Sequence, residues 1–147
     1  MIYKEEIRDL FSVPEDYYLA HCISADFKLG AGIALEFSKR FDTKTLLCTK
    51  CPNYCEAWNA YKMKGDCILE GRVLNLITKA RYFHKPTYIS MQHALRKMRT
   101  LCTLYNIKKV AMPLIGCGLD KLEWNEVSKM IQDTFASYDI EILVCKQ

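Results

Sequence analysis

Short apolar runs along this chain alternate with amphipathic, helix-like repeats. The short runs are rich in β-branched and aromatic residues, which is typical of buried strands. They cover residues 17–23, 67–70, 72–78, 107–113 and 140–145. We expect a tight turn at Gly71 to join the second and third of these strands, and the last strand to close the sheet.

Between the strands, apolar residues recur every three or four positions, which predicts helices that bury one face. We expect one helix over residues 31–41 and another over residues 124–138. The clearest helix follows Thr87, its expected N-cap. The apolar face of that helix is formed by Tyr88, Met91, Leu95, Met98, Cys102 and Tyr105. Strands that are apolar on both faces and alternate with such helices predict an α/β fold, a three-layer α/β/α sandwich around a mostly parallel sheet.

The length and composition fit one ordinary domain. The chain has 147 residues, of which 50% are hydrophobic, and this is enough to bury one core. No repeat, low-complexity segment or flexible linker divides residues 1–147, so we expect a single domain, and a monomer by default. The net charge of +4 permits a phosphate-bearing ligand but falls short of the basic surface of a dedicated nucleic-acid binder.

The eight cysteines raise the question of the cellular compartment. Residues 1–9 form a charged segment without the apolar stretch of a signal peptide. The apolar runs at residues 73–77 and 140–145 are far shorter than the roughly 18 residues that a membrane span needs. We therefore expect a cytoplasmic or nuclear protein with reduced thiols and no membrane partner.

Two loops carry a pair of glycines separated by one residue, at residues 30–32 and 116–118. Each loop follows a predicted strand, so both are expected at the carboxyl edge of the sheet, where ligands of open α/β folds bind. A strand, a Gly-x-Gly turn and a helix N-terminus leave backbone N–H groups available to a phosphate. Taken singly, either loop is more often just a tight turn. Together they favour a pyrophosphate held between them.

Lys79 and Asp120 are the two candidate catalytic residues. Lys79 closes a buried strand, and a partly desolvated lysine there could act as an amine nucleophile. Considered alone, it is more often a solvated strand-end lysine. Asp120 ends the second glycine loop, where it could be a helix-start carboxylate or a general acid and base. The residues by themselves favour the helix-start interpretation.

The histidines indicate no catalytic triad. His21 lies inside an apolar strand, which favours a hydrogen-bonded core histidine over a ligand. His84 follows in the loop after Lys79, and His93 is expected on the exposed side of the long helix. No spacing typical of a metal site or a triad joins the three.

Cys48, Cys51 and Cys55 form a C-x-x-C-x-x-x-C pattern, with Cys67 further along. Such spacing can bind zinc or act in redox chemistry. No histidine or second C-x-x-C pair completes a usual ligand set, so reduced structural thiols are the favoured interpretation. Cys117 lies within the second glycine loop, where a small side chain suits a crowded ligand site and no adjacent base would activate a thiol.

Five segments taken together resemble a known family. They are Ala-His-Cys-Ile-Ser at residues 20–24, Gly-Ala-Gly-Ile-Ala at 30–34, Leu-Ile-Thr-Lys at 76–79, His-Lys-Pro-Thr-Tyr at 84–88 and Met-Pro-Leu-Ile-Gly-Cys-Gly-Leu-Asp at 112–120. In this order they resemble the macro domains of the terminal ADP-ribose protein glycohydrolase type. The resemblance runs from residue 9 to residue 144.

The resemblance implies a macrodomain fold with a mixed six-stranded sheet and an ADP-ribose cleft at one edge. It implies hydrolysis of the bond between ADP-ribose and an acidic protein side chain, with O-acetyl-ADP-ribose as a further substrate of relatives. The family's nucleophilic lysine falls on Lys79 and its catalytic aspartate on Asp120. The amine would form a lysyl–ADP-ribose adduct, and the carboxylate would move protons while water resolves it. No metal or cofactor is implied.

The same resemblance implies a set of ligand-binding residues. Asp9 and Leu10 would meet the adenine, Ser24 the distal ribose, and the C-terminal residue the adenosine. The full set is Asp9, Leu10, Ser24, Gly30, Ala31, Gly32, Ile33, Leu114, Ile115, Gly116, Cys117, Gly118, Leu119 and Gln147.

Three departures from the family pattern bear on these expectations. Arg8 stands where relatives often have glycine, Leu114 replaces a common basic residue, and residues 42–66 match poorly and are longer than usual. The resemblance also leaves two alternatives to a protein-directed hydrolase. One is an ADP-ribose reader without turnover. The other is a hydrolase acting on ADP-ribosylated nucleic acid, which segments such as residues 96–99 would permit.

Overall fold

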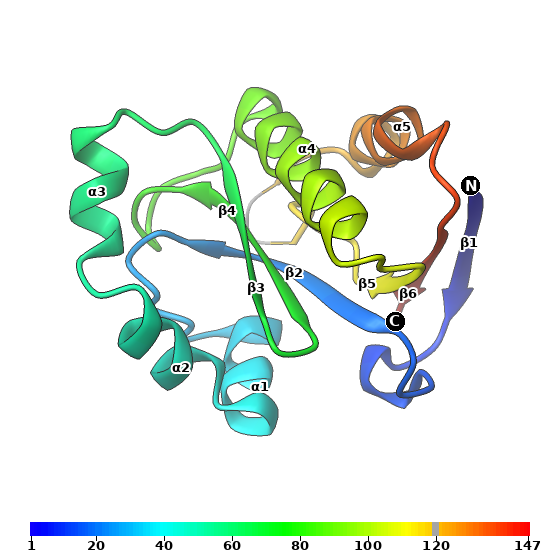
Figure 1. Ribbon diagram of the computed structural model, residues 1–147, viewed down its shortest axis with the longest axis horizontal. Coiled ribbons are helices and arrows are strands. Elements are labelled where there is room, and N and C mark those ends of the chain that lie inside the picture. Colours follow the sequence, from blue (N-terminus) through cyan, green and yellow to red (C-terminus); the bar gives the residue numbers. More distant parts are fainter. Residues whose placement is uncertain (119–120) are drawn as a thin grey trace.

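A six-stranded sheet organises the computed structural model, which describes residues 1–118 and 121–147. Over these residues the strand order is β1-β6-β5-β2-β4-β3, and all pairs are parallel except β3 with β4. Figure 1 shows helices on both faces of this sheet. The strands are β1 (Ile2–Ile7), β2 (Tyr18–Ser24), β3 (Asp66–Glu70), β4 (Val73–Lys79), β5 (Lys109–Met112) and β6 (Glu141–Lys146). The α-helices are α1 (Gly32–Phe41), α2 (Thr43–Lys50), α3 (Tyr54–Ala60), α4 (Tyr88–Leu104) and α5 (Trp124–Phe135), and one 3-10 turn covers Leu10–Ser12.

Alternate side chains of the central strands bury against opposite helix layers. On β4, Leu74 and Leu76 belong to the apolar cluster formed with α4 and α5. Val73 and Ile77 on the same strand pack into the two clusters that contain α1, α2 and α3. Because successive strand residues point to opposite faces, a strand covered on both sides is mostly apolar, and β4 is so apart from Asn75, Thr78 and Lys79. The expected three-layer α/β/α sandwich is confirmed.

The long helix begins where its sequence signal predicts. The Ser90 backbone N–H donates to Thr87 Oγ1 at 3.0 Å, and the Thr87 N–H donates to Ser90 Oγ at 2.9 Å. This reciprocal pair is a capping box that satisfies two N–H groups near the start of α4. The turn at Gly71, with φ of +58°, also joins β3 to β4 as expected.

The expected position of the last strand is wrong. β6 does not close the sheet, because β1 pairs with it in parallel and forms the edge. β1 gives no apolar signal, since only Tyr3 in this strand is partly buried. The poorly matching stretch also contains structure that the sequence analysis did not predict, namely α2 and α3. These short helices bury Leu47 and Trp58 against the end of the sheet.

None of the helices within residues 1–118 and 121–147 is both long enough and apolar enough to cross a membrane.

Candidate active site

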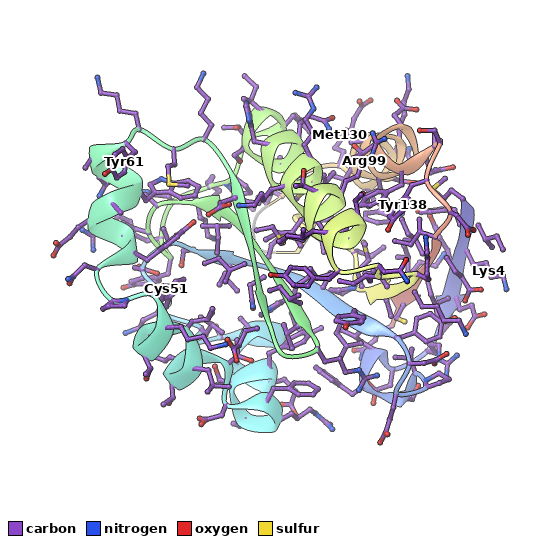
Figure 2. All side chains as sticks on the ribbon, viewed as in Figure 1. Lys4, Cys51, Tyr61, Arg99, Met130 and Tyr138 are labelled. Carbon is purple, nitrogen blue, oxygen red and sulfur yellow. The ribbon has the colours of Figure 1, made fainter. Side chains whose placement is uncertain are left out.

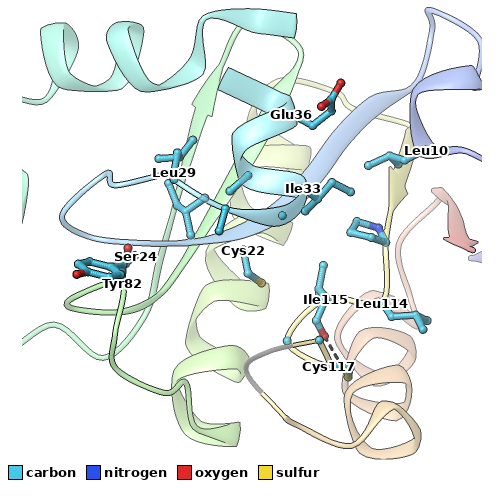
Figure 3. Close-up of a pocket in the computed structure, with 18 of the residues that line it drawn as sticks. Leu10, Cys22, Ser24, Leu29, Ile33, Glu36, Tyr82, Leu114, Ile115 and Cys117 are labelled. Carbon is cyan, nitrogen blue, oxygen red and sulfur yellow. Dashed lines mark hydrogen bonds between the residues drawn. The ribbon is translucent and has the colours of Figure 1, made fainter. Parts of the chain in front are cut away.

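A cleft of about 1200 Å³ lies at the carboxyl ends of β2, β4, β5 and β6 (Figure 3). It is the place where an open, mostly parallel sheet presents backbone groups to a ligand. Every described residue that the sequence analysis assigns to ligand binding or catalysis lines this cleft. These residues are Asp9, Leu10, Ser24, Gly30, Ala31, Gly32, Ile33, Lys79, Leu114, Ile115, Gly116, Cys117, Gly118 and Gln147. The remaining two, Leu119 and Asp120, lie outside the described residues.

The first glycine loop leads directly into the N-terminus of α1. Gly32 has φ of +56°, and a Cβ atom there would meet no atom within 4 Å, so the loop leaves open space at this point. Ala31, the N-cap, provides no side-chain hydrogen bond. The first N–H groups of α1 are therefore available to a ligand, and the helix dipole favours an anion at this position.

Buried side chains anchor the segment that precedes this loop. Phe27 and Leu29 both adopt positive φ values, of 52° and 42°, which are unusual for residues other than glycine. Both are buried, and the Phe27 ring stacks on Tyr54 of α3 at a centroid distance of 5.2 Å. The unfavourable backbone geometry is thus offset by packing against a helix that the sequence analysis did not predict.

Asp26 joins three segments around the cleft, and the sequence analysis missed it. Its Oδ1 accepts hydrogen bonds from the Ser24 hydroxyl at 2.6 Å and from the Lys28 N–H at 3.2 Å. Its Oδ2 accepts from the Tyr82 N–H at 3.0 Å. One carboxylate therefore holds together the end of β2, the approach to the first glycine loop and the loop after β4. The position of Asp26 two residues beyond a strand is a usual Asx-turn signal that could have indicated part of this role.

Lys79 is the last residue of β4 and is half-buried in the cleft wall. The Ala25 N–H donates to the Lys79 carbonyl at 2.9 Å, just after an irregularity in the β2–β4 register. This irregularity pairs Ser24 with Lys79 and sets the two residues side by side at the strand ends. The structure thus places the candidate nucleophile next to the serine that the resemblance assigns to the distal ribose.

The second glycine loop is packed tightly against α4. Gly116 has φ of +74°, and a Cβ atom there would come within 2.7 Å of Met91 Cε and 3.1 Å of Leu122 Cδ1. The Cys117 thiol donates to the Ile115 carbonyl at 3.3 Å (Figure 3). Burial raises the pKa of the Cys117 thiol to about 11, so it stays protonated at neutral pH and is a poor nucleophile.

At the other end of the cleft, Asp9 and Leu10 lie beside the C-terminus. The Arg8 N–H donates to the Lys146 carbonyl at 2.9 Å, which joins this segment to the end of β6 and to Gln147. Asp9 caps the 3-10 turn by accepting the Phe11 N–H at 3.0 Å. The Arg8 guanidinium donates to the Ser12 hydroxyl and carbonyl at 3.2 Å each. Arg8 thus braces the turn that presents Asp9, which gives a structural role to one departure from the family pattern.

His21 is a core histidine, as expected. It is fully buried, its Nε2 lies 2.6 Å from Asn75 Oδ1, and its ring stacks on Phe37 with centroids 3.9 Å apart. Because Asn75 Nδ2 donates to backbone carbonyls, Oδ1 is an acceptor and His21 Nε2 carries the proton. Burial lowers the pKa of His21 to about 4. His93 is exposed on α4, and His84 lines the cleft.

The patterned cysteines lie on α2, on α3 and between these two helices, where Figure 2 labels Cys51. Cys48, Cys51 and Cys55 line a small hollow of about 250 Å³ that also contains Asp26. Cys55 donates to the Ala80 carbonyl at 3.5 Å, and burial raises the pKa of the Cys51 thiol. Within residues 1–118 and 121–147 no three His, Cys, Asp or Glu side chains are close enough together to hold a metal ion.

Comparison with known proteins agrees with this arrangement. No family model matches the sequence. The human protein named ADP-ribose glycohydrolase OARD1 is 41% identical over 140 residues, which cover 92% of this chain and 86% of that protein. The macrodomain of Mycobacterium tuberculosis DarG aligns over 98% of this chain and 97% of its own, with a TM-score of 0.77 and 20% identity. The macrodomain of Thermus aquaticus DarG covers 99% of both chains, with a TM-score of 0.75 and 18% identity.

The two structural neighbours show the fold, and the more similar human protein shows the family. The cleft between two glycine loops, the lysine at the end of β4 and this similarity over nearly the whole chain agree with one another. The chain belongs to the macro domains of the terminal ADP-ribose protein glycohydrolase type.

Proposed function

We propose that this protein is a hydrolase that binds ADP-ribose and releases it from modified acceptors, in the first place from glutamate or aspartate side chains of proteins. The observation that carries the proposal is the position of Lys79, in the wall of a cleft that two glycine loops also line. The 41% identity to a human protein named as an ADP-ribose glycohydrolase supports the same activity.

The cleft suits an extended dinucleotide-like ligand. The adenosine would lie between Asp9 and Leu10 on one side and Gln147 on the other. The diphosphate would lie at the N-terminus of α1, where unpaired N–H groups and the helix dipole favour negative charge. The distal ribose would then reach Ser24 and Lys79. This order follows the direction of the cleft in Figure 3, in which Leu10 and Ser24 lie at opposite ends.

In the proposed reaction the Lys79 amine attacks the anomeric carbon of the distal ribose. The bond from this carbon to the acceptor oxygen breaks, and the acceptor leaves as a carboxylate with the bonding electron pair. A new carbon–nitrogen bond holds ADP-ribose on Lys79. Water then adds to the same carbon, the carbon–nitrogen bond breaks, and free ADP-ribose and the lysine amine are restored. Asp120 is proposed to accept and return the protons in both steps.

The decisive experiment uses a synthetic peptide with one ADP-ribosylated glutamate, and it measures release of ADP-ribose. We expect turnover by the natural protein and a loss of at least about 100-fold in Lys79→Ala, as is typical when a nucleophile is removed. Lys129→Ala is the matched control, because Lys129 is exposed on α5 and does not line the cleft. Full activity in Lys79→Ala would refute the mechanism.

Calorimetry with free ADP-ribose separates this proposal from an ADP-ribose reader. Tight binding without release from any modified peptide would support a reader and refute the hydrolase. The ADP-ribose release assay, repeated with O-acetyl-ADP-ribose and with an ADP-ribosylated DNA oligonucleotide, defines the range of acceptors. We propose that the protein side chain is the preferred acceptor, since the net charge of +4 falls short of that of a dedicated nucleic-acid binder.

A further inference from the structure

Two exposed aromatic side chains follow Lys79 in the loop between β4 and α4. Tyr82 is 56% exposed and Phe83 is 67% exposed, and both line the cleft. Large exposed apolar groups are common singly, but adjacent ones at the edge of a ligand cleft are typical of a binding surface. Neither ring belongs to the three apolar clusters that form the core.

The backbone and the rings of this loop are held in defined positions. The Tyr82 N–H donates to Asp26 Oδ2 at 3.0 Å, and the His84 N–H donates to the Arg81 carbonyl at 3.0 Å. The Tyr82 and Phe83 rings meet edge to face, with centroids 5.3 Å apart and an angle of 86° between planes. Phe83 and His84 meet in a similar way at 4.7 Å and 73°. The rings therefore present a preorganised surface, which lowers the entropic cost of binding.

The aromatic pair lies at the end of the cleft where the acceptor must leave. Figure 3 places Tyr82 near Ser24, at the opposite end from Leu10. The bonds from Ser24 and Tyr82 to the same Asp26 carboxylate keep the two close together. With the adenosine at the Leu10 end, the proposed distal ribose and the acceptor attached to it would lie at the end of the cleft that Tyr82 lines.

We propose that Tyr82 and Phe83 bind the polypeptide of the acceptor, through an apolar side chain next to the modified residue, and so determine which modified sites are hydrolysed. This inference rests on the proposed hydrolysis of ADP-ribosylated protein. Rings at 86° form a corner that encloses an aliphatic or aromatic side chain on two sides. The exposed Lys28, whose ammonium lies over the Tyr82 ring, complements acidic residues around a modified glutamate.

The geometry of the rings disfavours a nucleic-acid strand on the same surface. Successive bases stack on aromatic faces, and this requires rings whose faces are open and roughly aligned. Here the two rings are nearly perpendicular, and the Lys28 ammonium lies 5.5 Å from the Tyr82 ring centroid, over one of its faces. With Lys28 over the Tyr82 ring and Phe83 perpendicular to it, this surface suits one inserted side chain better than a run of stacked bases.

The test compares two peptides that differ only beside the single ADP-ribosylated glutamate, where one has leucine and the other glycine. We expect the natural protein to prefer the leucine peptide by about tenfold in kcat/KM, the usual size of discrimination in an apolar pocket. The Tyr82→Ala/Phe83→Ala double variant should lose most of this preference. Tyr105→Ala is the matched control, because Tyr105 is equally exposed at 56% but lies at the far end of α4, outside the cleft. It should keep the preference in full.

Peptide affinities measured in the Lys79→Ala background distinguish failure of the aromatic surface from failure of the proposed hydrolase. If the natural protein hydrolyses both peptides equally, or if the double variant keeps the preference, the aromatic surface is refuted and the hydrolase stands. If nothing is hydrolysed but the leucine peptide binds about tenfold more tightly to Lys79→Ala protein, the hydrolase is refuted and the aromatic surface stands. The polypeptide assignment would be overturned if the Tyr82→Ala/Phe83→Ala variant lost more kcat/KM on an ADP-ribosylated single-stranded DNA oligonucleotide than on the leucine peptide.

Discussion

Burial of His21 makes the stability of this protein depend on pH in a way that one substitution removes. The imidazole is enclosed between Phe37 and the sheet, and its Nδ1 has no hydrogen-bond partner among the residues that the structure describes. Protonation would place a positive charge in this apolar site, so burial lowers the pKa of His21 to about 4 from the ordinary 6.5. The unfolded chain therefore binds a proton at a higher pH than the folded protein does.

The size of the effect follows from these two pKa values. Between pH 6.5 and 4 the unfolded state holds more protons at this site, and the free energy of unfolding falls as the pH falls. With 6.5 unfolded and about 4 folded, linkage gives a loss of about 2 kcal/mol between pH 7 and pH 5. The loss reaches about 3 kcal/mol below pH 4. Above pH 7 His21 is neutral in both the folded and the unfolded state, so its burial causes no such loss in the free energy of unfolding.

The matched variant is His21→Gln, because a glutamine amide can still donate to Asn75 Oδ1 but does not titrate. Urea unfolding at pH 7, 6 and 5, followed by tryptophan fluorescence, to which the buried Trp58 contributes, gives the free energy of unfolding for both proteins. Titration of the surface carboxylates is common to both and cancels in the difference. We expect the natural protein to lose about 2 kcal/mol more than His21→Gln between pH 7 and pH 5. If the difference in the free energy of unfolding between the two proteins does not change between pH 7 and pH 5, the reasoning is refuted.

Two further substitutions test the loops around the cleft and the packing against α4. Asp26→Asn must lose at least one of the hydrogen bonds from the Lys28 and Tyr82 N–H groups, since an amide offers only one oxygen. Steady-state assays should show a several-fold lower kcat, and calorimetry should show a smaller change in ADP-ribose affinity. An equal loss of affinity would assign Asp26 to binding. Gly65→Ala would bring a Cβ atom within 2.3 Å of the Ser90 carbonyl of α4. Thermal and urea unfolding should show a loss of about 2–3 kcal/mol in the free energy of unfolding, and unchanged stability would contradict this packing.

Periodicity predicted the elements that are buried on a full face. β2, β4, β5, β6, α1, α4 and α5 all have enough apolar residues at the right spacing, and each was expected within a few residues of its observed bounds. β1 was missed because five of its six residues are exposed, so only pairing with β6 makes it a strand. α2 and α3 were missed because each is short and buries little beyond Leu47 and Trp58.

The candidate site was likewise predicted only in part from the sequence. The glycine loops and Lys79 are local signals, since each stands directly at the end of an apolar strand, and the structure places them around one cleft. Asp26 and the Tyr82–Phe83 pair were not identified, because their roles depend on contacts between loops 56 residues apart in the case of Asp26 and Tyr82. No local pattern reports such a contact.

The sequence by itself determined which long segments are buried, where α1, α4 and α5 begin and which loops can bind a phosphate, because side-chain periodicity, capping and glycine geometry are local properties of the chain. The tertiary structure decided the order of the strands, the edge position of β1 and the meeting of the β2, β4, β5 and β6 ends with the N-terminal turn in one cleft. These features depend on which apolar faces pack together over long separations in sequence. In this mildly basic, cysteine-rich domain the same packing forms a cleft that contains Lys79 and places the Tyr82–Phe83 pair at its edge.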